Sequence, residues 1–551
     1  MTAPGPCRRR GPSRDPVRGV PADPSAPSGV KPSHPRSVAH PKRGLSTGRH
    51  ANRIRAGEDG GVTQEFDELV SHAHDTRVVV VGGGIAGLVA ALECAKVGMR
   101  VTVLDAADRP GGAIRTAEVA GIRLDTGAES YATRGGAVHA LIDELGLADR
   151  ITTPDAAGAW LVGIPGVGAA PLPKGGVLGI PANPWAPDVR RIIGWTGAWR
   201  AYLDRLRPPL TIGHEHSLGR LVRTRLGAKV LDRLVSPVTT GVYSARPDDI
   251  DADVAAPGLN NALTRTGSLT GAVAQMRSGS GSRPGSAVEG LAGGMSTLVD
   301  ALVARLQELD ATVTTSAQVT AVAREGGTWR VAVAREEADV EADLLIMAAP
   351  EDTARRLLAA TVPGLARELG PAPVVEVVTM VLDAPALHAA PRGTGVLTVP
   401  GAFRAKALTH STAKWSWVAD AADGRHVVRV SFGAQGEPPA TEGLDDTAAA
   451  ALALAEASAM LGVELEPRAL LGAVRERYTQ SQPGAALGRA AEVAEMRRTV
   501  TATPGLAVVG AWLAGAGLAQ VVPDARRETD RIRRAALFGN ATETVEGDAT
   551  A

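Results

Sequence analysis

The most constraining feature of the chain is the stretch RVVVVGGGIAGLVAALECAKVGMRVTVLDA, which spans residues 77–106. Four consecutive valines precede the glycines, and such a run is typical of a strand that is buried on both faces, as in a parallel sheet. The apolar residues that follow have helical spacing up to Gly98, a residue type that commonly ends a helix. A second apolar strand then ends at Asp105. The stretch therefore predicts one complete β–α–β unit with a short crossover.

The turn between the first strand and the helix has the spacing of a dinucleotide site. Gly82, Gly84 and Gly87 fit G-x-G-x-x-G, in which the glycines permit the tight turn, the approach of a pyrophosphate and the close packing of the helix. The start of the helix offers free N–H groups to phosphates. Asp105 lies where a carboxylate can accept hydrogen bonds from ribose hydroxyls. The alternative interpretation is a tight turn without a ligand.

A second glycine loop distinguishes between the two common dinucleotides. The sequence DRPGGAIRT places Gly111, Gly112 and Arg115 directly after the acidic strand, and IRLDTGAES follows. An NAD site has no need of this loop, whereas FAD is longer and its ribityl and flavin groups need more backbone. The motif therefore favours FAD.

Bulk properties exclude several function classes. The 59 basic and 59 acidic residues balance, which argues against nucleic acid as a partner. Cys7 and Cys94 lie far apart, so the sequence predicts neither a disulfide framework nor a metal site and favours a reducing cytoplasm. The apolar runs 78–95 and 505–522 contain turn-forming glycines, so we interpret them as buried strand–turn–helix units and expect no transmembrane segment. Loose association with a membrane stays open.

Composition and periodicity divide the chain into seven segments. Residues 1–73 are rich in Pro, Arg and Ser without apolar periodicity, which predicts a disordered basic tail. We expect the remaining segments to be, in order, a first part of the FAD-binding domain (74–134), a mainly helical domain with substrate-side elements (135–285), a second FAD part (286–355), a substrate-binding domain (356–500), a third FAD part (501–540) and a flexible C-terminus (541–551).

Residues 76–130 resemble the flavin amine oxidase superfamily and its protoporphyrinogen oxidases. Members carry the dinucleotide turn, then E-x-x-x-R-x-G-G, then D-x-G; here Asp105 stands where Glu is usual. The segment GAWLAGAGLAQ (510–520) is similar to the family's C-terminal flavin segment. The resemblance covers about 75–538 and implies an α/β fold, in which a Rossmann-like FAD-binding domain is joined to a mixed-sheet substrate domain and a helical insertion.

The resemblance also implies the residues that hold one non-covalent FAD per chain. In the first two loops these are Gly82, Gly83, Gly84, Ile85, Ala86, Gly87, Asp105, Ala106, Gly112, Ala113 and Arg115. In the later segments they are Gly127, Ala128, Glu129, Ser130, Val319, Trp512, Gly515, Ala516, Gly517 and Leu518. The backbone of Val319 matches the position that meets the adenine.

Further stretches resemble the actinobacterial branch of oxygen-dependent coproporphyrinogen III oxidases. The most specific is SLGRLVRTRLGAKVLDRLVSPVTTGVYSARPDDI (217–250), which monoamine oxidases lack. The implied reaction forms coproporphyrin III for heme synthesis, with three hydride transfers to flavin N5 and oxygen as the acceptor, which leaves as peroxide. The cofactor then carries the chemistry, so no protein residue is assigned as catalytic. Pathway analogy suggests a transient contact with a ferrochelatase.

A substrate with four propionates needs cations at the rim of an apolar pocket. Arg134 lies near the flavin loop in the family layout and is the first choice for a propionate contact. Lys406 and Lys414 flank the strand ALTHSTAKW and are weaker choices. For each of the three, a solvated surface charge is the alternative.

Three other functions remain open at this point. The substrate could be protoporphyrinogen IX, which the sequence separates poorly from coproporphyrinogen III. A flavin oxidase for an amine or a polyene would need an aromatic cage or a long apolar tunnel. A non-catalytic FAD protein would bind flavin without turnover.

Overall fold

The computed structural model describes residues 59–207, 215–279, 288–336, 338–366, 372–479 and 486–539. Its first sheet is five-stranded and parallel, with β1 (Arg77–Val81) at the centre. The strand order is β12 (Thr312–Thr314), β2 (Arg100–Leu104), β1, β16 (Leu344–Met347) and β22 (Leu506–Val508). Three distant parts of the sequence thus build one sheet, and the predicted Rossmann-like α/β class is confirmed.

The valines of β1 explain how this sheet is covered on both faces. Val78 and Val80 belong to one core and Val79 and Val81 to another, as strand alternation requires. On the first face pack α2 (Ile85–Ala95), α11 (Ser296–Glu308) and α18 (Leu518–Phe538). On the second face lie β13 (Val319–Glu325), β14 (Thr328–Val333), β15 (Val340–Ala342), α12 (Glu351–Leu358) and α16 (Arg489–Thr501). The apolar runs 78–95 and 505–522 are therefore buried strand–turn–helix units, as predicted.

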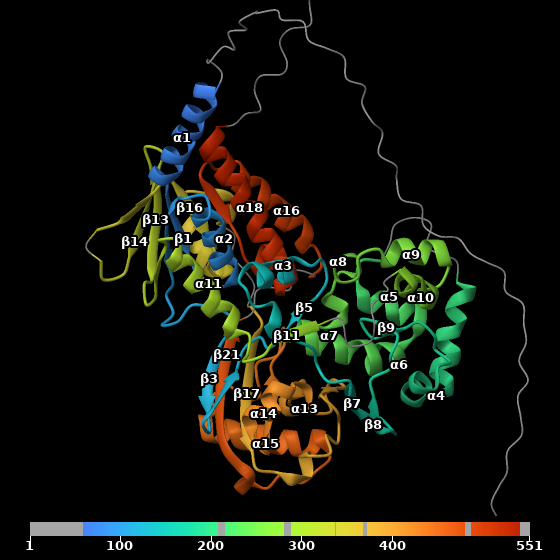
Figure 1. Cartoon of the computed structure of the whole chain (residues 1–551). Coiled ribbons are helices and arrows are strands. Elements are labelled where there is room, and N and C mark those ends of the chain that lie inside the picture. The colour runs from blue at the N-terminus through green and yellow to red at the C-terminus, as the bar shows by residue number, and fades with distance from the viewer. Residues whose placement is uncertain are drawn as a thin grey trace, which may run out of the picture. The chain divides into compact units, whose positions relative to one another are not determined.

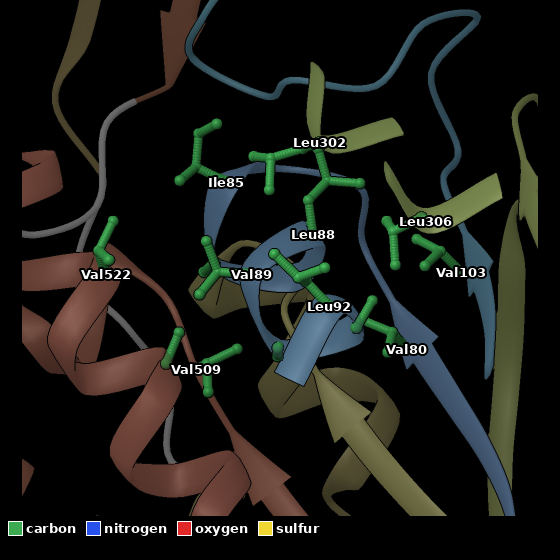
Figure 2. Close-up of a cluster of buried hydrophobic side chains, with 14 of the residues drawn as sticks. Val80, Ile85, Leu88, Val89, Leu92, Val103, Leu302, Leu306, Val509 and Val522 are labelled. Atoms are coloured by element: carbon green, nitrogen blue, oxygen red, sulfur yellow. The ribbon is translucent and has the colours of Figure 1, made fainter. Parts of the chain in front are cut away.

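Figure 2 shows the first of these cores around α2. Leu88, Val89 and Leu92 project from α2 toward side chains of the neighbouring elements. Those neighbours include Val80 and Val103 of the sheet, Leu302 and Leu306 of α11, Val509 after β22, and Val522 of α18. This core fixes the starts of α2 and α18 on one scaffold.

A second sheet has seven strands. Its order is β21 (Leu470–Thr479), β17 (Val374–Leu382), β20 (His426–Phe432), β19 (Ala407–His410), β18 (Gly395–Thr398), β7 (Ala159–Ile164) and β8 (Gly168–Pro171). Neighbouring strands are antiparallel except β18 and β7. The helix α15 (Asp446–Leu461) packs on this sheet, and α13 (Ser411–Lys414) and α14 (Ser416–Ala422) join β19 to β20.

The helical part of the chain has its own core, and Figure 1 shows it in green. It contains α4 (Pro187–Tyr202), α5 (Leu218–Leu226), α6 (Ala228–Val230), α7 (Ser236–Tyr243), α8 (Ala252–Ala255), α9 (Leu259–Thr266) and α10 (Leu269–Gly279). Shorter elements link the parts: β3 (Thr116–Val119), β4 (Ile122–Asp125), β5 (Tyr131–Ala132), α3 (Ala137–Glu144), β6 (Ile151–Thr152), β9 (Gly176–Val177), β10 (Ile180–Pro181), β11 (Val288–Leu291) and α17 (Ala511–Ala514).

Two details differ from the sequence prediction. The tail predicted for residues 1–73 is wrong over 59–73, where α1 (Asp59–Asp75) forms. Phe66, Leu69, Val70 and Ala73 recur at helical spacing there, and the Pro- and Arg-rich average of the tail hid that signal. The mainly helical segment 135–285 also contributes β7 and β8 to the second sheet. The predicted segments 1–58 and 541–551 lie outside the described residues.

Candidate flavin and substrate site

The first glycine turn contains two glycines that the fold requires, Gly82 and Gly87, and one that it does not require, Gly84. Gly82 has φ +110°, and a Cβ there would lie 2.8 Å from the carbonyl oxygen of Ala348. A Cβ on Gly87 would overlap the carbonyl oxygen of Gly82, because α2 packs directly on the turn. Both positions are thus glycine for reasons internal to the protein.

Gly84 has no such internal reason. Its φ of −71° and ψ of 173° suit any residue, and the nearest atom to a Cβ would be Gly112 Cα at 3.8 Å, an ordinary contact. Gly84 is also the N-cap of α2 and, within the described part of the chain, no side chain caps this helix. The N–H groups of the first turn, at Ile85, Ala86 and Gly87, are therefore available to an anion. Open space and free donors together fit a pyrophosphate.

Asp105 ties the end of β2 to the glycine turn. Gly83 donates its N–H to Asp105 Oδ2 at 2.7 Å, and Ala107 donates to Oδ1 at 2.8 Å. Each carboxylate oxygen accepts more than one hydrogen bond, so the same group can also receive a ribose hydroxyl. Ala106 beside it is exposed, and Val319 begins β13 close to the backbone that pairs with residues 105–107.

The second loop is joined to the first by backbone hydrogen bonds. Gly111 donates to the carbonyl oxygen of Gly83 at 2.8 Å, which brings Gly112 beside Gly84. Ala128 donates to the carbonyl oxygen of Ala113 at 3.0 Å, and a Cβ on Gly127 would overlap that same oxygen. The loops around residues 82–87, 111–115 and 126–128 thus form one surface. The adjoining strands β1, β3 and β5 lie in different parts of the fold (Figure 1).

The third glycine segment provides a second helix start. Gly515 and Gly517 have φ of +98° and +100°, and Gly517 is the N-cap of α18 without a side-chain cap among the described residues. Ala516 and Gly517 are exposed, while Leu518 is half-buried. The side chain of Trp512 lies instead in the core behind the sheet, so only its backbone faces the segment's turn. Two uncapped helix starts therefore belong to one core.

A buried ion triad supports the loop that follows Gly127. Glu129 accepts from Lys414 at 2.5 Å and from Arg429 at 2.8 Å. Arg429 also donates to the carbonyl oxygens of Thr126 and Gly127, at 3.0 and 2.5 Å. Burial disfavours the charged Glu129, but Lys414 and then Arg429 lower its pKa to about 2. Glu129 therefore stays charged at neutral pH, and the triad holds the loop against the second sheet.

Buried polar atoms beside Gly127 bear on whether a flavin fits. The Nε of Arg429 has no hydrogen-bond partner among the described residues, and the buried hydroxyls of Thr126 and Tyr478 interact only with each other. The Tyr478 hydroxyl would lie 2.9 Å from a Cβ on Gly127, so it faces this loop, and burial raises its pKa to about 12. Buried polar atoms are normally paired. These atoms, the open position at Gly84 and the two helix starts fit a polar, phosphate-bearing group such as FAD.

Arg115 and Ser130 lie at the margins of this surface. The guanidinium of Arg115 donates to the carbonyl oxygen of Gly112 at 3.4 Å and lies 3.6 Å from Glu476. Ser130 is half-buried and leads into β5. Both residues belong to the loop surface, and neither has a contact that assigns it to one part of the cofactor.

Arg134 lies between the helical part and the third glycine segment. It is exposed, and it contacts Gln520 at 3.1 Å in the amide orientation that also lets Gln520 donate to Ala514. Burial raises the pKa of Tyr243 on α7, and the charge of Arg134 nearby opposes that shift. Arg134 is therefore an accessible cation beside the flavin segment.

Lys406 and Lys414 have different surroundings. Lys406 is only 8% exposed, and its Nζ donates to the Ser244 hydroxyl at 2.6 Å, at the end of α7. Burial lowers its pKa to about 8. Lys414 is paired with Glu129, so its ammonium supports the loop. Of the two, Lys406 is the cation without a carboxylate partner among the described residues.

The sequence analysis did not identify Arg429, Tyr478 or Tyr243. Arg429 stands in the apolar strand HVVRVSF, and a charged residue in such a strand needs a buried partner. That signal was readable, but the partner Glu129 lies 300 residues away in the chain. Outside this site, His216, Asp251 and Asp253 bring ligand-type atoms within 4.8 Å of one another. Asp251 caps α8 and Asp253 accepts from Asn260, so local structure accounts for both carboxylates.

Comparison with known proteins agrees with this geometry. The sequence model of the flavin containing amine oxidoreductase family matches residues 85–532, and that of the pyridine nucleotide-disulphide oxidoreductases matches residues 31–133. The chain therefore belongs to the flavin containing amine oxidoreductase family, and the predicted resemblance is confirmed.

Within that family, the similar curated proteins include several coproporphyrinogen III oxidases. That of Propionibacterium freudenreichii is 28% identical over 87% of this chain and 94% of its own length. That of Mycobacterium bovis is 32% identical over 82% of this chain and 96% of its own length. The crystal structure of a putative protoporphyrinogen oxidase from Exiguobacterium is 25% identical, has a TM-score of 0.72, and matches 83% of this chain and 99% of its own. A putrescine oxidase structure with 19% identity and a TM-score of 0.58, matching 84% of this chain and 99% of its own, shares the fold.

The search for membrane-spanning helices gave a negative result. Within the described ranges, no helix combines the length and the apolar character that crossing a bilayer requires.

Proposed function

We propose that the chain catalyses the oxidation of coproporphyrinogen III to coproporphyrin III with one non-covalent FAD and oxygen as the acceptor. The observation that supports this most directly is the 32% identity to the mycobacterial enzyme over 96% of that enzyme's length. The open pyrophosphate position at Gly84 and the uncapped starts of α2 and α18 agree with it. The reaction removes six electrons and six protons, so three molecules of oxygen become three of hydrogen peroxide.

The residues of the chain would bind and orient the two partners. When bound, the flavin would supply the redox chemistry: it would accept hydride from the macrocycle and pass the electrons on to oxygen. The glycine loops hold the pyrophosphate through backbone N–H groups, and the Glu129–Lys414–Arg429 triad fixes the loop at residues 126–129. Arg134 and Lys406 would each bind a propionate of the macrocycle, since both are cations without a carboxylate partner among the described residues. No general acid or base on the protein is required by this scheme.

Oxygen and the next enzyme of the pathway complete the proposal. The protein would act in the cytoplasm, and its product would pass to a ferrochelatase by transient contact. Protoporphyrinogen IX is the competing substrate, since the similar Exiguobacterium protein is named a putative protoporphyrinogen oxidase.

The experiment that tests the function uses purified, flavin-loaded protein in air. Coproporphyrinogen III and protoporphyrinogen IX are supplied separately, and porphyrin fluorescence and peroxide are measured. We expect coproporphyrinogen III to be oxidised with the higher kcat/KM and with three peroxides per porphyrin. Preference for protoporphyrinogen IX, or bound flavin with no turnover of either compound, would overturn the proposal. The Gly84→Val variant serves as the control for oxidation without enzyme.

A further inference from the structure

Lys406 is a buried cation that directly precedes β19 in the second sheet. It is only 8% exposed, and its ammonium donates to the Ser244 hydroxyl at 2.6 Å. Arg429 on the neighbouring strand β20 is paired with Glu129, whereas no carboxylate among the described residues is paired with Lys406. Burial is the only cause that lowers its pKa. Because a buried ammonium normally has an ionised partner, that partner would have to come from a ligand.

Ser244 is held in an uncommon backbone conformation beside this ammonium. It follows the last residue of α7 with φ 53° and ψ 28°, in the left-handed region that serine seldom adopts. Gln435, which follows β20, donates its backbone N–H to the Ser244 carbonyl oxygen at 2.7 Å. The helix itself packs closely on β18, since a Cβ on Gly241 would lie 2.5 Å from Leu397 Cδ2. The hydroxyl and the ammonium are therefore fixed relative to each other.

Lys406 and Ser244 together offer the donors that a carboxylate requires. An ammonium has three N–H donors, and one of them serves the Ser244 hydroxyl. The hydroxyl that accepts this bond keeps its own O–H as a donor. A carboxylate of a ligand can accept from both groups at once, and hydrogen bonds between charged partners are the strong ones. The pair is thus suited to a carboxylate rather than to an apolar group.

The end of α7 has a second cation nearby, with different surroundings. Tyr243 directly precedes Ser244, and the nearby charge of Arg134 opposes the rise of its pKa. Arg134 is exposed, whereas Lys406 is buried. An exposed guanidinium stays hydrated when no carboxylate meets it, so an unpaired ligand group there costs little. A buried ammonium has no such alternative, and leaving it unpaired is costly.

The polarity of the two candidate macrocycles determines which edge would meet the buried ammonium. Both compounds carry propionates on two neighbouring pyrroles, and these form one polar edge. Because charged groups keep their water where they can, this edge would face the exposed Arg134. The opposite edge would then enter toward Lys406. It carries two vinyl groups in protoporphyrinogen IX and two further propionates in coproporphyrinogen III, so only the latter gives the ammonium a partner.

We propose that Lys406 and Ser244 form the specificity-determining site of the substrate chamber, which binds a propionate where protoporphyrinogen IX carries a vinyl group. Lys406 makes the charged contact, and Ser244 is the residue that positions it. The inference rests on the proposed function and adds to it the residues that select the substrate. A site whose buried donors are left unpaired rejects a ligand far more strongly than an apolar pocket rejects an extra group.

The test measures kcat/KM for both porphyrinogens with the full-length, flavin-loaded protein. The wild type should prefer coproporphyrinogen III by at least about a hundred-fold. Lys406→Met keeps the length of the side chain but removes its charge, and should lose about a hundred-fold with coproporphyrinogen III, chiefly through KM. With protoporphyrinogen IX the same variant should improve, because the vinyl edge no longer meets a charge. The preference should therefore fall to within about ten-fold.

Two substitutions at Ser244 separate positioning from a merely structural role. Ser244→Gly removes the hydroxyl at a backbone conformation that suits glycine, and should raise KM for coproporphyrinogen III about ten-fold with kcat and flavin content unchanged. Ser244→Asn should recover most of this loss, because asparagine tolerates the left-handed region and its side-chain oxygen accepts from the ammonium. Loss without recovery would mean that Ser244 only shapes the backbone.

The matched control is Lys229→Met on α6. Lys229 donates to the Thr196 hydroxyl at 2.7 Å, so it forms the same kind of pair on the exposed surface. This variant should leave kcat/KM for both porphyrinogens unchanged. Flavin absorbance and circular dichroism check that all variants are folded and loaded.

A binding measurement keeps this inference separate from the proposed function. Fluorescence titration compares coproporphyrin III with its tetramethyl ester, which has the same shape but no carboxylates. The wild type should bind the free acid more tightly, and Lys406→Met should bind the two compounds almost equally. If the wild type oxidises neither porphyrinogen, the proposed function fails, and this comparison still decides whether Lys406 binds a carboxylate.

Two results would overturn the inference while the proposed function stands. The first is an equal loss of kcat/KM with both porphyrinogens in Lys406→Met, which would mean that Lys406 binds a propionate that the two compounds share. The second is a preference for coproporphyrinogen III that Lys406→Met leaves unchanged, which would place the selection of the substrate elsewhere in the chamber.

Discussion

The glycine loops and the second sheet contribute to the same site by different means. At the loops, the site is formed by backbone N–H groups and by the space that missing side chains leave, as at Gly84, Gly111 and Gly517. At the sheet, side chains far apart in sequence meet as charges, as in the Glu129–Lys414–Arg429 triad. A site formed by backbone groups is encoded by a short local motif. A site formed by side chains that are far apart in the sequence is assembled only when the chain folds. The two regions should therefore respond differently to mutation.

The largest expected effect is at Gly84. Replacing it by valine in Gly84→Val fills the space above the first turn of α2 and should reduce flavin affinity by about a thousand-fold or more, equivalent to about 4 kcal/mol. The purified protein should be colourless, while its circular dichroism and its unfolding as apoprotein should change little, because the Cβ meets no closer atom than Gly112 Cα at 3.8 Å. Absorbance at the flavin bands and calorimetric titration with FAD measure the effect.

The control for this substitution is Gly87→Val. A side chain there overlaps the Gly82 carbonyl, so the apoprotein itself should be destabilised or fail to fold. If both variants lose flavin and stability equally, or if Gly84→Val remains yellow, the distinction between an open and a packed glycine is wrong.

The next effect concerns the ion triad. Arg429→Met removes a partner of the buried Glu129 and two hydrogen bonds to the loop at Thr126 and Gly127, so it should lower the free energy of unfolding by about 3 kcal/mol. Flavin affinity should fall as well, because the loop loses its support. Urea unfolding of the apoprotein and flavin titration separate the two effects.

The matched control is Arg468→Met, which breaks the exposed pair with Glu466 and should change stability by less than about 1 kcal/mol. The effect at Arg429 should also depend on pH. The pKa of Glu129 is about 2 in the folded protein and ordinarily 4.5, so the triad stabilises above pH 4.5 and loses its contribution as pH falls toward 2. An undiminished difference between wild type and variant near pH 2 would exclude this account.

Lys406 should show opposite effects on stability and on activity. Its folded pKa is about 8 and its ordinary value 10.5, so the unfolded chain binds more protons between these values and the stability of the wild type rises with pH across that window. Lys406→Met should therefore stabilise the protein at neutral pH by up to about 3 kcal/mol, and the gain should vanish above pH 10.5. The same variant should raise KM for coproporphyrinogen III, since a propionate would lose its cation.

Thermal unfolding at several pH values and steady-state kinetics test this pair of effects. Lys174→Met, at an exposed lysine, is the control and should change neither quantity. A Lys406→Met variant that is destabilised at neutral pH would contradict the cost assigned to the buried ammonium. One that is stabilised but has an unchanged KM would remove Lys406 from the substrate site.

The same contrast explains what could be predicted from the sequence. The strand of valines, the glycine turn and the helix that follows are local, so β1 and α2 were predicted closely. The parallel pairing of β18 with β7 joins Gly395 to Ala159, and no local pattern specifies such a partner. Glu129 was predicted, through the resemblance, as a cofactor residue, but its role in the triad depends on Arg429, 300 residues later. Sequence periodicity gives elements and motifs, whereas the pairing of distant elements is decided by packing.

The smallest expected effect is at Arg134. Its contact with Gln520 at 3.1 Å places an accessible cation beside the third glycine segment, near Tyr243 of α7. Arg134→Ala should raise KM for coproporphyrinogen III about ten-fold, or about 1.4 kcal/mol, because one charge-assisted hydrogen bond to a propionate is lost. Flavin content should remain that of the wild type, because in the proposed function the glycine loops bind the cofactor through their backbone.

Arg265→Ala, at an exposed arginine on α9, is the matched control and should leave KM unchanged. Steady-state kinetics with coproporphyrinogen III and the flavin-to-protein absorbance ratio are the two measurements. Loss of flavin together with the rise in KM would assign Arg134 to the cofactor region. An unchanged KM with full flavin would mean that the propionates are bound by the second sheet alone, and the substrate would then lie nearer to Lys406 than to the third glycine segment.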